Sequence, residues 1–227
     1  MTDGVLVFGA SQRTGLEVTK ILTARDEQVT AFVRPSSERE NLEKLAVNFT
    51  VGDVLDAETV EAAFASGNFR AVINTIGGQR GQPRPDLEGT INIVDAAKRH
   101  GIKRMLMVTM VGAGDSADVL SENARKFLGP VAEIKTQAED YLMKSGLDAT
   151  VLRPGGMRSE PATGSAIKTE DHTVMGMIHR ADLAALVVES LDDGETIGKI
   201  FHAFDPEIKE SPPLQSGAKP NFSGAKP

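Results

Sequence analysis

Short apolar runs alternate with amphipathic stretches from the first residues to about residue 204, and this alternation restricts the possible folds most. Repeated strand–helix units of this kind favour a mostly parallel sheet over a β-sandwich or a helical bundle. The runs are rich in Val, Ile, Leu and Met, which suits strands that helices cover on both faces. We expect strands at residues 5–8, 28–33, 47–51, 71–75, 104–109, 149–152 and 200–204. The spacing of apolar residues predicts helices at residues 15–24, 57–65, 87–100, 132–145 and 181–191.

The size and composition of the chain are those of one α/β domain. Its 227 residues are 40% hydrophobic and 25% charged, as in ordinary globular proteins. We expect a single domain over residues 1–208, with a doubly wound sheet, helices on both faces and a small substrate-lid region near its end. Residues 209–227 are rich in Pro, Ser, Gly and Lys and contain Ser-Gly-Ala-Lys-Pro twice, which predicts a flexible tail. The alternative for this tail is a segment that closes over the site or over a neighbouring subunit.

Charge and missing residue types exclude several classes of function. The net charge of -7 disfavours binding to nucleic acid or to an anionic membrane, because both need a basic surface. The absence of cysteine excludes disulfides, thiolate metal ligands and a cysteine nucleophile. Neither metal-ligand spacing of His and carboxylates nor a Gly-X-Ser-X-Gly elbow is present, so we expect no metal and no hydrolase chemistry. We expect a cytoplasmic protein, monomeric or weakly dimeric, whose partner is a small-molecule substrate.

A glycine-containing turn follows the first expected strand and leads into a helix. Backbone amides at such a helix N-terminus can bind a pyrophosphate, and the helix dipole favours its charge. The pattern resembles the Gly-Ala-Ser/Thr-X-X-X-Gly of extended and atypical short-chain dehydrogenase/reductases, with Gln12 where the middle glycine is usual, so a side chain must be accommodated there. The resemblance implies a Rossmann fold that binds a nicotinamide dinucleotide; the alternative is a tight turn without a nucleotide. The predicted binding residues of this turn are Gly9, Ser11, Gln12, Arg13, Thr14 and Gly15.

The end of the second strand predicts which dinucleotide is bound. NAD-selective proteins place an acidic residue there, about twenty residues after the glycines, to bind the ribose 2′-hydroxyl. This chain has Arg34 and Ser36 instead, and a guanidinium suits a 2′-phosphate. Arg13 could reach the same phosphate. NADP(H) is therefore the preferred cofactor and NAD(H) a possible one, with a solvated role for Arg34 as the alternative.

Two further turns carry the same resemblance. Gly52-Asp53-Val54 resembles the border of the adenine pocket, where Asp53 would accept from the exocyclic amine; the alternative for Asp53 is a plain Asx turn. Asn74-Thr75-Ile76-Gly77-Gly78 resembles the small-residue turn that lies against the nicotinamide ribose and the pyrophosphate. The resemblance thus adds five cofactor-binding residues, which are Asp53, Val54, Thr75, Ile76 and Gly77.

The expected catalytic residues follow the fifth strand and lie on the next helix. Thr109 occupies the family's Ser/Thr place, and Lys135 begins its Lys-X-X-X-Glu pattern, so we expect both to be catalytic and Lys135 also to hold the nicotinamide ribose. Their alternatives are a strand-end residue and a solvated lysine. The family's tyrosine is missing, because Val131 stands in its place. Tyr141 lies six residues after Lys135, about 240° around a helix, so we expect it in the core.

The last motifs narrow the resemblance to one branch. Leu152-Arg153-Pro154-Gly155-Gly156 and Ile178-His179-Arg180-Ala181-Asp182-Leu183 resemble the atypical branch that contains NmrA-like proteins and the biliverdin reductase B/flavin reductase group. The resemblance covers about residues 4–204. It implies that Pro154 and Gly155 flank the nicotinamide.

Residues 156–173 are expected to form a variable substrate lid, because they lack regular apolar spacing. For Asp182 we expect a charge partner at a helix N-terminus rather than a catalyst. His172 and His179 are expected on the surface, with a proton relay as the alternative. Met157, Met175 and Met177 suit either a soft apolar wall or the core.

Two functions fit these patterns. The first is an NAD(P)H-dependent reductase of a conjugated acceptor such as a flavin, quinone or tetrapyrrole, because solvent can then deliver the proton without a tyrosine acid. The second is an NmrA-like protein that senses the redox state of the dinucleotide or supports an assembly without turnover.

Overall fold

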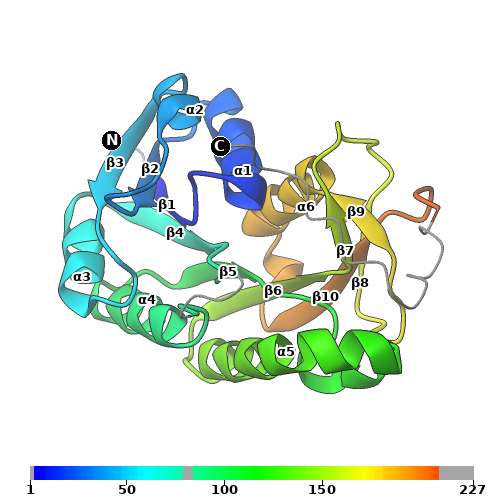
Figure 1. Ribbon diagram of the computed structural model, residues 1–227. Helices are drawn as coiled ribbons and strands as arrows, with labels where there is room; N and C mark the ends of the chain where they lie inside the picture. Colours follow the sequence, from blue (N-terminus) through cyan, green and yellow to red (C-terminus); the bar gives the residue numbers. More distant parts are fainter. Residues whose placement is uncertain (1–2, 79–83, 210–227) are drawn as a thin grey trace.

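The sheet has the strand order β3-β2-β1-β4-β5-β6-β10-β8, in a computed structural model that describes residues 3–78 and 84–209 (Figure 1). Its strands are β1 (Gly4–Phe8), β2 (Val29–Val33), β3 (Val47–Val51), β4 (Phe69–Asn74), β5 (Arg104–Val108), β6 (Asp148–Pro154), β8 (Ile167–Thr169) and β10 (Lys199–Phe204). All pair in parallel except β8, which runs antiparallel to β10 at the edge. This is the expected doubly wound Rossmann sheet, so the predicted fold class is confirmed.

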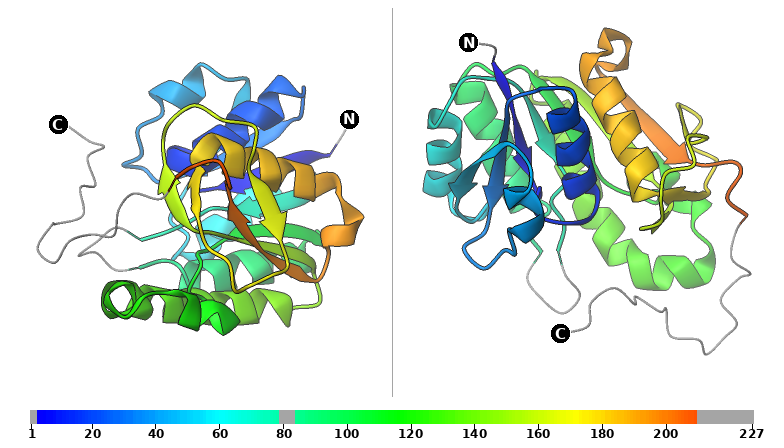
Figure 2. Two further views of the ribbon diagram at one scale, coloured as in Figure 1. Left: turned by 90° about the vertical axis from the view of Figure 1, so that its right-hand side faces the viewer. Right: turned by 90° about the horizontal axis from the view of Figure 1, so that it is seen from above.

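Helices cover both faces of the sheet. They are α1 (Arg13–Ala24), α2 (Glu40–Glu43), α3 (Ala57–Ala65), α4 (Glu88–Arg99), α5 (Glu122–Met143) and α6 (Arg180–Asp192), with 3₁₀ turns at Gly114–Val119 and Gly194–Thr196. Helices α1 and α6 lie side by side on one face, and α3, α4 and α5 cover the other (Figures 1 and 2). None of the helices in the described ranges is long and apolar enough to cross a membrane.

The two cores are separated by the sheet, as the pleat of β1 shows. Val5 and Val7 belong to the core under α1 and α6, whereas Leu6 and Phe8 belong to the core under α3 and α4. Successive side chains of a strand point to opposite faces, so an uninterrupted apolar run fills both layers. Burial of each such side chain contributes about 1.5–3 kcal/mol.

Helix α5 begins at Glu122, ten residues before the expected start at residue 132. The side chain of Ser121 accepts a hydrogen bond from the Ala124 amide and caps the helix. Phe127 and Leu128 are exposed in this first half. The sequence analysis missed these turns because they have no apolar face toward the core, and because Pro130, which cannot donate its backbone nitrogen, lies among them.

The C-terminal third adds a small second sheet beside the main one. Strand β7 (Gly156–Arg158) pairs in parallel with β9 (Met177–His179). The expected lid, residues 156–173, therefore contains regular structure, because β7 and β8 both lie within it. Three-residue strands are too short for an apolar period to indicate them.

Candidate dinucleotide and acceptor site

The strand order reverses between β1 and β4, and ligands of open α/β sheets bind at this point, beyond the carboxyl ends of the strands. The glycine turn lies there. A Cβ on Gly9, whose φ is +83°, would lie 2.6 Å from Thr75 Oγ1, and one on Gly15 would lie 2.1 Å from the Gly9 carbonyl oxygen. Both positions thus require glycine, since the start of α1 packs directly on the turn.

The start of α1 is open to an anion. Gln12 is the N-cap residue, but its side chain makes no capping hydrogen bond, and the first turn contains no acidic residue. The amides of a first helical turn have no partner within the helix and favour negative charge. The Gln12 side chain is exposed, so it takes the place of the missing middle glycine without entering the core.

The end of β4 is fastened to the end of β1. The backbone amide and the hydroxyl of Thr75 both donate to the carbonyl oxygen of Phe8, at 3.0 and 2.9 Å. Asn74 Oδ1 accepts from the Ile76 amide at 3.0 Å. Ile76 is buried and Gly77 is exposed. These contacts bring the predicted turn over residues 74–78 against the glycine turn.

Lys135 reaches this edge from α5 and is buried there. Its Nζ donates to the Ile76 carbonyl oxygen at 2.9 Å and pairs with Asp86 Oδ1 at 2.8 Å. Asp86 also accepts from the Gly78 amide and pairs with Arg84. Burial opposes ionisation of Asp86, but Lys135 and Arg84 outweigh it and lower the pKa of this carboxyl. The solvated alternative for Lys135 is therefore wrong, because only 7% of the residue is exposed.

Thr109 lies at the end of β5 with its hydroxyl proton already engaged. Its Oγ1 donates to Glu139 Oε1 at 2.5 Å, and its amide donates to the Leu152 carbonyl oxygen. Arg153 holds Glu139 in turn, with Nε 3.1 Å from both carboxylate oxygens and Nη2 2.6 Å from Oε2. A hydroxyl has one proton. Thr109 can thus offer only oxygen lone pairs to a ligand.

The network continues from Arg153 to the acceptor side. Its Nη1 donates to Asp115 Oδ1 at 2.5 Å, and Asp115 Oδ2 lies 2.8 Å from His172 Nδ1. Burial opposes ionisation of Asp115, but hydrogen bonds from Arg153 and His172 lower its pKa to about 2. The sequence did not predict Asp86, Asp115 or the contact of Arg153 with Glu139 as parts of the site. In the sequence, Asp86 is an acid ahead of a helix, Asp115 is an acid in a loop, and Arg153 is the arginine within a turn motif.

The adenosine side shows both a free cation and an Asx turn. Arg34 and Ser36 are exposed at the end of β2, and no carboxylate in the described ranges forms an ion pair with Arg34. Asp53 Oδ1 accepts from the Leu55 amide at 3.0 Å, which is the Asx turn weighed as its alternative. Val54 is buried under Gly89, so it supports the turn from below.

Close backbone packing surrounds the end of β6, where the acceptor is expected. Pro154 is buried at the end of β6, and a Cβ on Gly155 would lie 1.9 Å from the Gly176 carbonyl oxygen. Met157 of β7 accepts a weak hydrogen bond from the Thr14 hydroxyl, with sulfur and oxygen 3.9 Å apart. The base of the lid therefore contacts the first turn of α1. Met177 is partly buried and Met175 is exposed.

Asp182 and His179 hold the segment that is expected to form the lid, residues 156–173. Asp182 is buried and accepts from the amides of Thr163 and Gly164, both at 2.9 Å, so it holds the lid loop as well as standing in the first turn of α6. His179 is 7% exposed, and its Nδ1 lies 2.7 Å from the Pro161 carbonyl oxygen. The expectation of a surface His179 is wrong, because the lid covers it.

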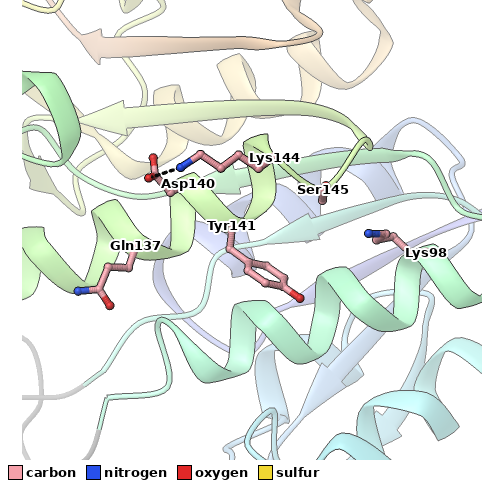
Figure 3. A pocket seen from close by; sticks show the side chains of 6 residues that line it. All are labelled: Lys98, Gln137, Asp140, Tyr141, Lys144 and Ser145. Carbon is pink, nitrogen blue, oxygen red and sulfur yellow. Dashed lines mark hydrogen bonds and ion pairs between the residues drawn. The ribbon is translucent and has the colours of Figure 1, made fainter.

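Tyr141 is exposed, so its expected place in the core is wrong. Its hydroxyl donates to Asp95 at 2.7 Å, and its ring lines a surface hollow of about 410 Å³ between α4 and α5 (Figure 3). Helical rotation showed only that Tyr141 points away from Lys135. The direction away from Lys135 leads to the outside of the molecule here, so Tyr141 does not supply the missing acid.

The fold and the glycine cradle define a Rossmann-type dinucleotide-binding protein. Residues 9–194 match the family described as NAD(P)H-binding. The chain therefore belongs to this family, among its atypical short-chain dehydrogenase/reductase members.

Individual proteins from other organisms are also similar to this chain. YhfK of Bacillus subtilis, described as an uncharacterized sugar epimerase, is 32% identical over 87% of this chain and 92% of its own. ChuY from Escherichia coli O157:H7, an anaerobillin reductase, is 31% identical and superposes with a TM-score of 0.83 over 92% of this chain and 100% of ChuY. Sanguinarine reductase from Eschscholzia californica is 26% identical over 87% of each chain.

Proposed function

We propose that this protein is an NAD(P)H-dependent reductase that transfers hydride to a small conjugated acceptor, such as a flavin, quinone or tetrapyrrole. The single observation that carries the proposal is how the side chains at the carboxyl ends of the strands are hydrogen-bonded and paired. Thr109 donates its proton to Glu139, and Lys135 pairs with Asp86. A site built in this way can position a dinucleotide and an acceptor, but the engaged Thr109 hydroxyl cannot act as the acid that reduction of an isolated carbonyl needs, and Lys135 is directed to Asp86 and Ile76.

The residues at the edge fit a nicotinamide dinucleotide. Gly9 and Gly15 let the glycine turn pack closely against Thr75 and the start of α1, and the open start of α1 suits a pyrophosphate. Bound NAD(P)H supplies a hydride. The Lys135 ammonium has three protons, of which two are directed to Ile76 and Asp86, so one remains for the ribose hydroxyls.

Thr109 and the turn at Pro154 and Gly155 act on the nicotinamide side. The Thr109 oxygen accepts a hydrogen bond from the nicotinamide amide or from the acceptor, since its own proton is engaged. Charge that develops on a conjugated acceptor is delocalised, so water delivers the proton after hydride transfer. The names of ChuY and sanguinarine reductase support a reductase.

We further propose that NADP(H) is preferred. Arg34 and Ser36 stand exposed beyond β2, beside the glycine turn at the end of the neighbouring β1. A free guanidinium there suits the 2′-phosphate. Arg34→Glu replaces this partner by a like charge, so it should weaken NADPH binding far more than NADH binding, as measured by titration of each. Arg25→Glu, on the far end of α1, is the matched control; equal losses for both cofactors at position 34 would remove the argument.

The function is tested by following NADPH oxidation by absorbance, beside NADH, with FMN, biliverdin, quinones and simple aldehydes. The proposal predicts turnover of at least one conjugated acceptor, faster with NADPH, and none of simple aldehydes. Tight NADPH binding without turnover across the panel would instead support the sensor or assembly protein. Reduction of aldehydes alone would contradict the reasoning about the missing acid.

A further inference from the structure

Two arginines open the two neighbouring helices on one face of the sheet. Arg13 is the first residue of α1, and Arg180 is the first residue of α6. The helices pack side by side (Figures 1 and 2). Arg13 is exposed and holds a left-handed backbone conformation with φ of 54°. Arg180 is partly buried, and its Nη1 donates to Ser159 Oγ at 2.8 Å in the lid.

No carboxylate in the described ranges forms an ion pair with either guanidinium, and Arg180 has fewer hydrogen-bond partners than Arg153 and Arg104. Arg153 is held by Glu139 and Asp115, and Arg104 donates to several backbone carbonyls and threonine hydroxyls. The nearby acid Glu160 is engaged by His179 Nε2, at 3.1 Å.

Electrostatics make the pair a site for an anion. Burial first, and then the charge of Arg13, lower the pKa of Arg180. Two like charges that lie close enough to affect each other, one of them partly desolvated, are unfavourable without a counter-ion. The N-terminal dipole of α1, whose first turn contains no acidic residue, adds positive potential. The free protein therefore holds two neighbouring positive charges that an external anion can neutralise.

The position of the pair indicates which anion. Helix α6 lies on the side of α1 that faces β7 and β9, whereas α2 and the end of β2 lie on the other side (Figures 1 and 2). The contact of Thr14 with Met157 joins the start of α1 to β7. A dinucleotide held between Arg34 and Thr109 would have its pyrophosphate near the start of α1, where two guanidiniums could bind phosphate oxygens at once.

We propose that Arg13 and Arg180 together bind the pyrophosphate of the dinucleotide, and that Arg180 couples this binding to the lid through Ser159. The inference rests on the proposed function. It assigns Arg13 to the pyrophosphate rather than to the 2′-phosphate, and it adds Arg180, which sequence analysis placed only within a motif.

The test is Arg180→Ala, with dissociation constants for NADPH and NADH measured by titration at low salt. A lost charge-assisted hydrogen bond should raise both constants by the same factor, about tenfold or more. Arg25→Ala removes the same charge from the other end of α1 and should change neither constant. Without dinucleotide, Arg180→Ala should melt at or above the wild-type temperature, because it removes an uncompensated charge. Addition of NADPH should raise the melting temperature of Arg180→Ala less than that of the wild type.

Each other outcome overturns the assignment in its own way. A loss with NADPH alone would place the pair at the 2′-phosphate. Unchanged dinucleotide constants with a raised KM for the acceptor would place it at an acidic group of the acceptor. Unchanged values throughout would overturn the anion site while the proposed function stands. Failure of the wild-type chain to bind either dinucleotide would overturn both.

Discussion

The buried pair of Lys135 and Asp86 gives the sharpest quantitative prediction. Lys135→Met keeps most of the apolar stem but removes the ammonium, so Asp86, whose side chain is fully buried, loses the partner at 2.8 Å. Removing one member of a buried ion pair costs about 3–5 kcal/mol, because the remaining charge is left uncompensated. Asp86 keeps Arg84 and the Gly78 amide. We therefore expect a loss at the lower end of this range, about 3 kcal/mol, in the free energy of unfolding.

Urea unfolding at neutral pH measures this loss, and two variants control it. Lys144→Met, on the same helix, breaks an exposed pair with Asp140 and should cost less than about 0.5 kcal/mol. The double variant Lys135→Met/Asp86→Asn removes both charges and should recover to within about 1 kcal/mol of wild type. Equal small effects of Lys135→Met and Lys144→Met, or a double variant less stable than Lys135→Met, would refute the reasoning.

Two further predictions concern the glycine turn and the acceptor side. Gly15→Ala should weaken NADPH binding, measured by titration, and destabilise the fold by about 1–3 kcal/mol in urea unfolding, because its Cβ would meet the Gly9 carbonyl oxygen. Gly194→Ala is the control and should change neither quantity, because no atom lies within 4 Å of its Cβ. Asp115, with its pKa lowered to about 2, contributes stability above pH 4 that is lost as pH falls from 4 toward 2, so wild type should lose under about 1 kcal/mol more than Asp115→Asn over this interval. The carboxylate is 67% exposed, which limits the effect, and parallel acid-unfolding curves would contradict it.

Sequence predicted the main sheet well because its strands are buried on both faces. The seven principal strands lie within two residues of their expected bounds, and so do α1, α3, α4 and α6. A buried strand or helix needs an apolar run or an apolar period, so the local sequence indicates where it lies. The first half of α5 has no apolar face toward the core, and the strands β7, β8 and β9 are too short, at three residues each, for an apolar period to indicate them.

The candidate site was predictable only where a motif fixes the backbone. Gly9 and Gly15 are required because a turn of this kind packs too closely for a Cβ at either position. Asp86 and Asp115 meet their partners Lys135 and Arg153 only through the tertiary fold, across 49 and 38 positions of sequence. Spacing along one helix cannot reveal such pairs.

Hydride transfer from bound NADPH is tested most directly by single-turnover oxidation of NADPH that carries deuterium at both hydrogen positions of nicotinamide C4. The protein is mixed with the acceptor that it reduces fastest, and the NADPH absorbance is followed beside unlabelled cofactor. The account predicts that the bound cofactor is oxidised and that deuterium slows the decay. Bound NADPH that stays unoxidised with every conjugated acceptor, labelled or not, would contradict it.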